Sequence, residues 1–479
     1  MNSLKSTLSV AIAATVLNSA VNAAGIPSEK PQTMEEMWKI IQAQQQQIDS
    51  MTKKLEAVTQ KPSNGDVSNL ERKTNVLTEE VEKLRTELVV PEKTEYKSAY
   101  GLGPAASKVY QVGKGLSIGG YGEANYQVRI DDQGGRTVNG NVSTPTNYDN
   151  TDVERLVIYT GYKFTDNILF NSELEFEHAS TGNNNSGVSS SSTGTVSVEM
   201  AALDFFINPM VNVRAGMLLM PMGFINQIHE PPFFFGNNRP EVERRIIPST
   251  WRENGAGLFG ELLPGLTYTT YVVNGMNARN FDSAGIRSGR QSGGQALAED
   301  LAYVGRLDYT PPMFPGVMVG GSAYFGHSGQ NQLFNGRQLD VATQLYEAHL
   351  QWKYRGLEFR TLGSWGHIGD AAALSATKGA TIGEENYGWY SELGYDILPD
   401  FIHDTTQYLA PFVRYERMDT VATVPVGRLD DLTRDVEIYQ VGLNYKPIPN
   451  VVIKADYRNF TQKSGASPDD FNLGVGFIF

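Results

Sequence analysis

Residues 469–479 restrict the fold of this chain more than any other segment. Apolar side chains fall at every second position, and polar or small ones fill most positions between them: Phe471, Leu473, Val475, Phe477 and Phe479 against Asn472, Gly474 and Gly476, with Ile478 as the exception. A period of two predicts a β-strand with one apolar face. A strand of this kind that ends on an aromatic residue is typical of membrane β-barrels, which must close because lipid cannot satisfy an open sheet edge. The rest of the chain should therefore supply partner strands.

Alternation of the same kind recurs from Leu116 onward, with turn residues between the runs. We predict about sixteen antiparallel strands in one closed barrel over residues 115–479. The predicted strands are 115–130, 152–163, 168–178, 195–207, 210–219, 254–261, 264–273, 301–310, 316–326, 340–354, 356–367, 384–396, 408–417, 435–446, 449–460 and 469–479. A soluble β-sandwich or solenoid is the alternative that the alternation alone leaves open.

The connections between these strands alternate in length. Short ones, such as 208–209 and 355–356, are followed by long ones, such as 220–253 and 274–300. In outer-membrane barrels the short turns face the periplasm and the long loops face outward. An even number of strands then places both ends of the barrel on the periplasmic side.

Residues 1–23 have the pattern of a signal peptide. Lys5 precedes a short apolar core at 8–17, and Val21, Asn22 and Ala23 form the expected cleavage site. The core is too short for a membrane anchor. We therefore expect export of the mature chain.

Residues 24–90 are predicted to form a periplasmic α-helical coiled coil. Seam residues are spaced alternately by four and three in two runs: Met37, Ile41, Gln44, Ile48, Met51, Leu55 and Val58, then Leu70, Thr74, Leu77, Val81, Leu84 and Leu88. A stripe this narrow needs partner helices, which favours a homotrimer. A helical hairpin or spacer without a fixed oligomeric state is the alternative. Residues 91–114 are then a linker into the barrel.

Composition removes several functional classes. The chain has 53 acidic and 40 basic residues, which argues against nucleic acid as a partner. Beyond the N-terminus there is no apolar run long enough for a membrane-spanning helix. No nucleophile elbow, metalloprotease motif or phosphate-binding glycine loop occurs, so we expect no enzyme activity, no catalytic residues, no cofactor and no metal site. Glu173, Glu175 and Glu177 read as a row on one strand face, and His178 beside them is a weak metal suggestion.

Charged residues of both signs occupy the predicted inward positions. Because a charge facing lipid costs roughly 2–4 kcal/mol, their number indicates a wet interior and not a dry core. The predicted lumen lining is Arg155, Glu173, Glu175, Arg214, Arg306, Asp308, Lys353, Arg360, Arg414, Lys454 and Arg458. As a set these charges could filter permeants by charge. Singly, each could simply pair with a neighbour across strands.

The long connection at 220–253 differs from the other loops because it holds three consecutive phenylalanines at 233–235. We expect these rings inside the barrel, packed on its wall, so that the charged residues of the loop narrow the pore. The predicted constriction residues are His229, Glu230, Arg239, Glu241, Glu243, Arg244, Arg245 and Arg252. A contact between subunits or an external cap is the alternative.

Residues 152–162, 170–178 and 215–224 resemble the porins of the phosphate-selective porin O and P family. The resemblance covers roughly residues 115–479 and implies a trimeric, sixteen-stranded channel with an infolded third loop. That family's anion selectivity depends on arginines and lysines, whereas the inward charges here are mixed. The coiled coil followed by a barrel also resembles porin-like proteins of siderophore uptake.

Three functions therefore remain. The leading one is a porin in the bacterial outer membrane, in contact with its lipid, for passive, charge-tuned diffusion of small hydrophilic solutes or ions. The second is a ligand-specific channel of the siderophore-uptake type. The third is an envelope tether whose coiled coil contacts the cell wall. The identity and charge of the permeant are not determined by the sequence.

Overall fold

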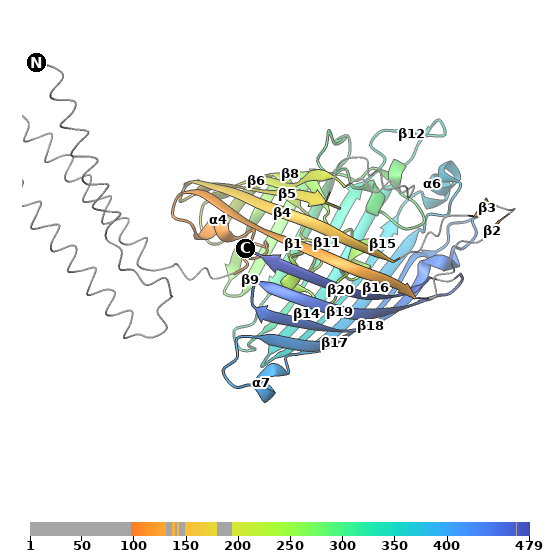
Figure 1. The fold of residues 1–479 in the computed structure, drawn as a ribbon. Coiled ribbons are helices and arrows are strands. Elements are labelled where there is room, and N and C mark those ends of the chain that lie inside the picture. The colour runs from red at the N-terminus through yellow and green to blue at the C-terminus, as the bar shows by residue number, and fades with distance from the viewer. Residues whose placement is uncertain (1–96, 131–136, 139–140, 143–148, 180–193, 466) are drawn as a thin grey trace, which may run out of the picture. The chain divides into compact units, whose positions relative to one another are not determined.

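The computed structural model describes residues 97–479 apart from 131–136, 139–140, 143–148, 180–193 and 466. Its main feature is a closed barrel of sixteen strands, in which each strand pairs with its neighbours along the chain and β1 pairs with β20 (Figure 1). The predicted signal peptide, coiled coil and first part of the linker lie outside the described residues.

The barrel strands are β1 (Gly115–Ile130), β4 (Asn150–Thr165), β5 (Ile168–Glu177), β6 (Val196–Phe206), β7 (Asn212–Leu219), β8 (Arg252–Leu263), β9 (Leu266–Asn274), β10 (Leu301–Tyr309), β11 (Val317–His327), β14 (Ala342–Tyr354), β15 (Leu357–Ile368), β16 (Glu385–Tyr395), β17 (Tyr408–Thr423), β18 (Asp435–Ile448), β19 (Val451–Gln462) and β20 (Asp469–Ile478). Two small hairpins lie in long loops: β2 (Thr137–Val138) with β3 (Asn141–Val142), and β12 (Leu333–Phe334) with β13 (Arg337–Gln338). All sixteen predicted strands are confirmed, although β17 continues past its predicted end at 417 to Thr423.

Short helices occupy the connections. They are α4 (Lys108–Gln111), η1 (Pro231–Phe233), α5 (Val242–Arg245), η2 (Ala278–Asn280), η3 (Arg287–Gly289), α6 (Ala371–Lys378), α7 (Leu398–Phe401) and η4 (Leu432–Arg434). No helix among the described residues is long and apolar enough to cross a membrane.

The last strand closes the barrel as its alternation predicts. β20 runs antiparallel to β1, and the backbone N–H and C=O of Phe479 bond to Gly120 at 2.9 and 3.0 Å. The side chains of Leu473, Val475 and Phe477 stay about two-fifths exposed on the outer face, at 43%, 44% and 39%. Ile478, the exception to the alternation, points inward and is buried.

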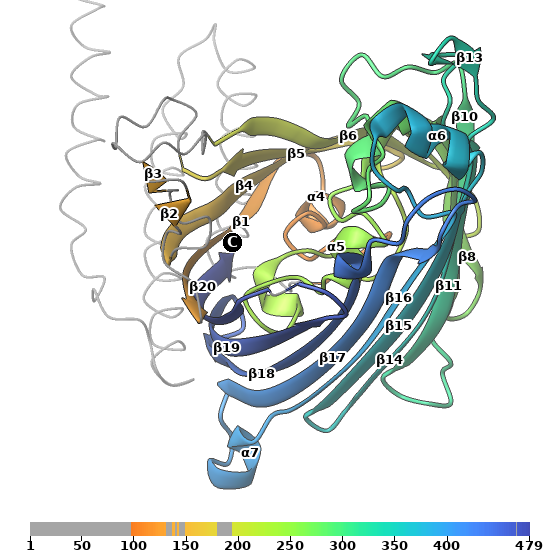
Figure 2. The same cartoon turned by 90° about the vertical axis from the view of Figure 1, so that its right-hand side faces the viewer.

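The prediction of a wet interior is wrong for a large part of the barrel. A cluster of buried apolar residues joins inward side chains of β9, β11 and β16, including Tyr271, Tyr324 and Tyr390, to Trp251 and Ile246 of the connection before β8. The dry region arises because some inward positions of these strands are apolar. Long loops fold into the barrel and cover these apolar positions. Figure 2 shows α5 inside the ring of strands.

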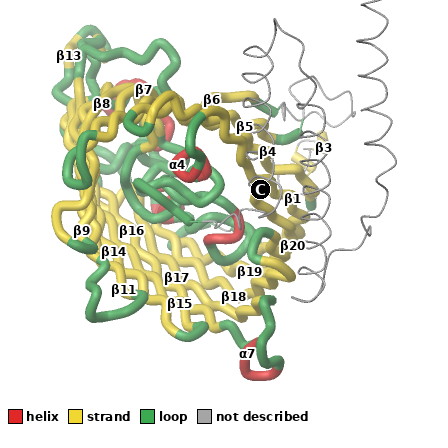
Figure 3. Tube along the Cα trace, turned by 90° about the vertical axis from the view of Figure 1, so that its left-hand side faces the viewer, coloured by secondary structure: helices red, strands yellow, loops and turns green. Residues whose placement is uncertain are grey.

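Most of the predicted linker also lies inside the barrel. We call residues 97–114 the N-terminal segment; its helix α4 appears within the ring of strands in Figure 3. Leu102, Ala105 and Ala106 are buried against inward residues of the wall, Ile478 among them. The inward isoleucine that interrupts the C-terminal pattern is therefore part of the surface that receives this segment.

Candidate functional site

The connection between β7 and β8, residues 220–251, folds into the barrel as predicted. We call it the infolded loop. It carries η1 and α5, and most of its side chains are buried. Phe234 and Phe235 are each 3% exposed, so the three phenylalanines lie within the barrel and not outside it. Arg252, predicted in this loop, instead begins β8.

Three cationic side chains of the wall hold the backbone of the infolded loop. Arg360 Nη2 donates to the carbonyl of Phe233, Arg414 Nη2 to that of Phe235, and Lys454 Nζ to that of Gly236, each at 2.8 Å. They come from β15, β17 and β19. A carbonyl buried away from water needs such a donor, because an unpaired polar group in the interior is costly. These predicted lining residues therefore anchor the loop.

Acidic and amide groups of the wall bind the loop's backbone N–H groups. Asp456 Oδ1 accepts from the backbone of Asn237 at 2.7 Å, and Glu416 Oε2 accepts from the backbone of Val242 at 3.0 Å. Arg414 also pairs with Glu392 at 2.7 Å, with both side chains 1% exposed. Charges of both signs on the wall thus match donors and acceptors of the loop.

Ring contacts, and glycines that leave room for the loop, complete the contact between the infolded loop and the wall. Phe235 stacks on Phe412 at 5.1 Å between centroids, and Lys454 Nζ lies 3.6 Å from the centre of the Phe234 ring. A Cβ added at Gly394 would meet Phe235 Cζ at 2.4 Å, and one at Gly474 would meet the Asn237 side chain at 2.0 Å. Gly474, which faces inward on the C-terminal strand, is therefore required because the loop approaches the strand closely.

Two carboxyl groups of the loop are buried and bind neighbouring segments. Glu230 Oε1 accepts from the backbone N–H groups of Ala105 and Ala106, and Glu243 accepts from the backbone of Ile225 and the Tyr390 hydroxyl. Burial raises the pKa of Glu230 and of Glu243 to about 7, and the hydrogen bonds oppose that rise only in part. Both groups titrate near neutral pH.

Cationic side chains of the wall bind the N-terminal segment, namely Arg214 of β7 and Lys163 of β4, whose Nζ donates to the carbonyl of Val112 at 3.2 Å. Arg214 donates two hydrogen bonds to Asp204, at 2.7 and 2.8 Å. It also donates to the Tyr110 hydroxyl and the Tyr100 carbonyl. Both members of the ion pair are buried. Nearby, Arg306 donates hydrogen bonds to the carbonyl of Gly223 and to Asp308. Asp308 also pairs with His349.

A polar cavity of about 460 Å³ opens toward the long-loop end of the barrel. We call it the vestibule. Seven arginines and four glutamates line it: Arg129, Arg155, Arg239, Arg244, Arg245, Arg287 and Arg458, with Glu123, Glu154, Glu177 and Glu241. The positive charge of the lining exceeds the negative charge, although the whole chain has a net charge of −13.

Most arginines of the vestibule are paired with carboxylates: Arg155 with Glu123, Glu154 and Glu175, and both Arg129 and Arg458 with Asp470. Glu241 accepts from Arg244 and Arg245 at 2.7 and 2.8 Å; burial raises the pKa of Glu241, but these guanidinium groups outweigh it and hold that pKa well below its usual range. Burial, and then neighbouring guanidinium groups, lower the pKa of Arg287. The Arg239 side chain has no hydrogen bond or ion pair to any described residue, and its Nε and Nη2 atoms are buried.

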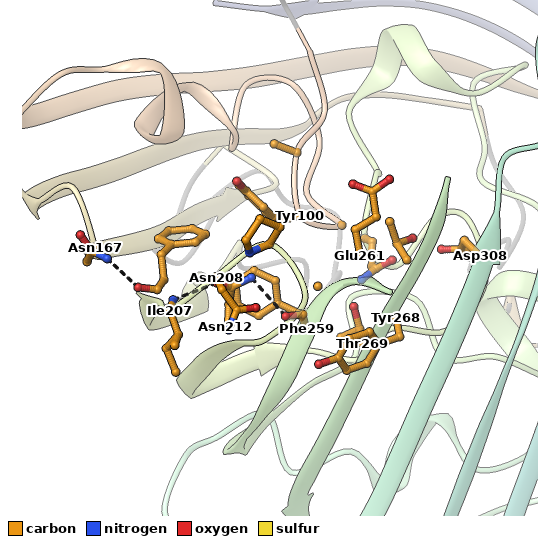
Figure 4. A pocket seen from close by; sticks show the side chains of 17 residues that line it. Tyr100, Asn167, Ile207, Asn208, Asn212, Phe259, Glu261, Tyr268, Thr269 and Asp308 are labelled. Carbon is orange, nitrogen blue, oxygen red and sulfur yellow. Dashed lines mark hydrogen bonds between the residues drawn. The ribbon is translucent and has the colours of Figure 1, made fainter. Parts of the chain in front are cut away.

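A second cavity, of about 600 Å³, lies at the short-turn end (Figure 4). Tyr100 of the N-terminal segment faces residues of the turns and of β8 and β9 across it, including Asn208, Phe259 and Thr269. Asp308 lies at its far side. The infolded loop and the N-terminal segment therefore occupy the lumen between a cavity at each end.

The predicted lining residues have different roles. Arg155 and Arg458 line the vestibule and Asp308 lines the other cavity, whereas Arg214, Arg360, Arg414 and Lys454 bind the N-terminal segment or the loop. Lys353 pairs with Glu358 at 3.0 Å. Glu173 and Glu175 are buried under the loop. Sequence reasoning missed the lumenal position of the N-terminal segment; Ile478 was the one signal of it.

The chain resembles several known proteins. No family model matches it. An "Uncharacterized protein" of Aquifex aeolicus (strain VF5) is 38% identical over 409 residues, covering 83% of this chain and 87% of that protein. Among solved structures, a loop-deletion mutant of OmpT of Vibrio cholerae has a TM-score of 0.48 at 10% identity, covering 77% of this chain and 100% of that one. OmpF of Salmonella typhi with daunomycin has 0.48 at 11%, covering 77% and 98%. The channel DcaP of Acinetobacter baumannii has 0.46 at 12%, covering 76% and 97%.

Proposed function

We propose that this chain, which belongs to the same family as the uncharacterized protein of Aquifex aeolicus, is an outer-membrane porin for small hydrophilic solutes. Transport is passive, and the charge of the vestibule tunes which solutes pass. The observation that carries this proposal is the arginine-rich vestibule inside a closed barrel.

The outer surface of the barrel supports a membrane location. Large apolar side chains stay exposed along its strands, such as Val413 and Val441 at 52% and 51%. Aromatic residues add to them, for example Tyr162, Trp352 and Trp389 at 41%, 40% and 41%. A closed barrel satisfies its backbone groups within itself, which is what lipid demands. We expect the short turns on the periplasmic side and the long loops outside.

The charge distribution supports a preference for anions. Opposed charges in a narrow, low-dielectric passage act strongly on an ion because little water screens them. In the vestibule seven arginines face four glutamates, and Arg239 has no hydrogen bond or ion pair to a described residue. Inorganic and small organic anions should therefore enter more readily than cations of the same size.

Reversal potentials in planar bilayers test this proposal. Under a potassium chloride gradient, the full-length protein should carry more chloride than potassium current. Replacing Arg244 and Arg245 together by alanine should lower the ratio of chloride to potassium permeability by roughly twofold or more. Arg428→Ala removes the same kind of charge from a loop outside the vestibule lining and is the matched control.

Two results would oppose the proposal. Absence of any conductance from correctly folded protein would rule out a diffusion channel. A cation preference, or an equal loss of selectivity in Arg428→Ala, would show that the vestibule does not set the ion preference.

The size of the vestibule also favours a second candidate, a ligand-specific uptake channel of the siderophore type. Ligand sites commonly enclose about 300–1,000 Å³, and the vestibule measures about 460 Å³. Block of the conductance by micromolar ligand would support it. The homotrimer, and the tether through cell-wall contact of the coiled coil, stay predictions because residues 24–90 lie outside the described part of the chain.

A further inference from the structure

Three side chains with metal-binding atoms meet between the barrel wall and the infolded loop. Glu173 comes from β5, Glu199 from β6 and His229 from the loop. Their exposed fractions are 0%, 1% and 1%, and one ligand atom of each lies within 4.8 Å of those of the other two. They are far apart in the sequence, and only the infolding of the loop brings the histidine to the two carboxylates.

A β-bulge directs Glu199 into this cluster. In the pairing of β5 with β6, Glu173 faces Met200 but Leu174 faces Val198, so Glu199 is the additional residue. Both Glu199 and Met200 are consequently buried on the inner face, against the alternation of a regular strand. A bulge re-aims a side chain at some cost to strand pairing, and bulges are over-represented next to functional sites.

The hydrogen bonds of His229 leave a lone pair facing the carboxylates. Its Nδ1 lies 3.3 Å from the backbone carbonyl of Asn226, which can only accept, so Nδ1 carries a proton. In the neutral ring Nε2 then has a lone pair; because this nitrogen lies 3.0 Å from Glu173 Oε1, a proton or a metal cation must lie between the two atoms. A histidine that donates one ring N–H to a carbonyl and turns the other nitrogen to a cation is the usual arrangement of a metal ligand.

The carboxylates have oxygens that the protein does not satisfy. Among the described residues, Oε2 of Glu173 and Oε2 of Glu199 have no hydrogen-bond partner. Glu199 Oε1 pairs with Arg252 at 2.6 Å, which supplies one positive charge. Glu175 is also buried beside them on β5. Buried carboxylate oxygens without partners are costly unless a cation or a proton neutralises them.

We propose that Glu173, Glu199 and His229 bind one divalent transition-metal cation that joins the infolded loop to the barrel wall. One imidazole and two carboxylates suit Zn²⁺, with water or a further oxygen completing the shell. Mg²⁺ and Ca²⁺ are disfavoured because they prefer oxygen ligands alone. The metal links β5, β6 and the loop, whereas the arginine and lysine anchors of the loop come from β15, β17 and β19.

Metal content and affinity test the site without reference to transport. The full-length, tag-free protein, purified in detergent without chelator, should contain about one Zn²⁺ per chain by mass spectrometry. After removal of metal, calorimetric titration with Zn²⁺ should restore one site per chain. Glu199→Gln and His229→Gln should each weaken Zn²⁺ binding by roughly 10–100-fold or more. Glu154→Gln, a change of carboxylate on the same inner wall that leaves the cluster intact, should bind Zn²⁺ as the unchanged protein does.

A measurement on the unchanged sequence protects the test from variants that fail to fold. Co²⁺ added to metal-depleted protein should give the visible absorption of a low-symmetry site, and Zn²⁺ should abolish it. The proposal is overturned if neither Zn²⁺ nor Co²⁺ binds, in which case protons neutralise the cluster. It is overturned equally if Zn²⁺ affinity is the same in His229→Gln and Glu154→Gln, or if Ca²⁺ binds more tightly than Zn²⁺. None of these outcomes depends on ion selectivity, so the porin proposal stands or fails separately.

Discussion

The infolded loop and the N-terminal segment both occupy the lumen, but the wall holds them differently. Charged side chains of alternate strands bind the loop by its backbone, as Arg414 does at Phe235. The N-terminal segment makes polar bonds to Arg214 and Lys163 as well, but its small and apolar side chains also pack on the wall, with Leu102 2% exposed. Glu230 joins the two, because this loop carboxylate accepts from the segment's backbone.

The two kinds of contact should allow the infolded loop and the N-terminal segment different amounts of movement. An ion pair buried in the wall fixes a direction as well as a position, and losing one partner leaves an uncompensated charge. Apolar contacts have no preferred direction and are lost gradually with area. We therefore expect the infolded loop to be the fixed part of the passage and the N-terminal segment to be the part that can detach.

The largest effect should follow from removing a buried charge that holds the loop. Arg414→Met leaves Glu392 without its closest partner, which costs about 3–5 kcal/mol, since both side chains are 1% exposed. The temperature at which the folded band disappears on denaturing gels should fall strongly. Val413→Met, the neighbouring residue at 52% exposure on the outer face, is the control. Equal losses in the two variants would contradict the anchoring role.

A smaller and more local effect should follow from Leu102→Ala. Loss of a buried leucine costs about 2–4 kcal/mol, and here it should loosen the N-terminal segment alone. Trypsin should then cut after Lys108 of α4, while the barrel keeps its unfolding temperature. Leu116→Ala, at an outward leucine that is 60% exposed, should leave the cleavage rate unchanged. A lower unfolding temperature without new cleavage would show that the segment is part of the barrel's own stability.

Gly394→Ala should disturb the loop less. Its new Cβ would lie 2.4 Å from Phe235 Cζ, and the stacked ring has little room to move. Overpacking of this kind costs about 1–3 kcal/mol and should change the single-channel conductance. In Gly363→Ala the nearest atom is 3.8 Å away, so that variant should conduct normally. Identical conductance in both variants would mean that the loop does not set the pore size.

The smallest expected effect is a pH dependence from Glu243. Its pKa is raised by burial from the ordinary 4.5 to about 7, so between these pH values the folded protein binds more protons than the unfolded chain. The contribution of Glu243 to the free energy of unfolding is then greatest below about pH 4.5 and declines as pH rises toward 7. Glu243→Gln should reduce this decline by on the order of 1 kcal/mol, measured as unfolding temperature from pH 5 to pH 8. Glu437→Gln, at a partly exposed carboxyl, should leave the decline intact.

The sequence by itself predicted where the strands lie and which residues of a regular strand share a face. Alternation is a local property, because neighbouring side chains of a strand must point to opposite sides. It sufficed for all sixteen strands and for the closure through Phe479. The run of three phenylalanines likewise marked the infolded loop, because such rings need a buried place.

The partners of the inward residues were decided only by the tertiary structure. Arg360 binds the carbonyl of Phe233, 127 positions away, and alternation contains no information about that distance. The bulge at Glu199 moves a carboxylate to the inner face through the pairing of two strands. The N-terminal segment enters the lumen because the infolded loop and the wall together form an apolar surface on which it packs. Inside and outside follow from one strand, whereas contacts across the lumen depend on how the whole barrel closes.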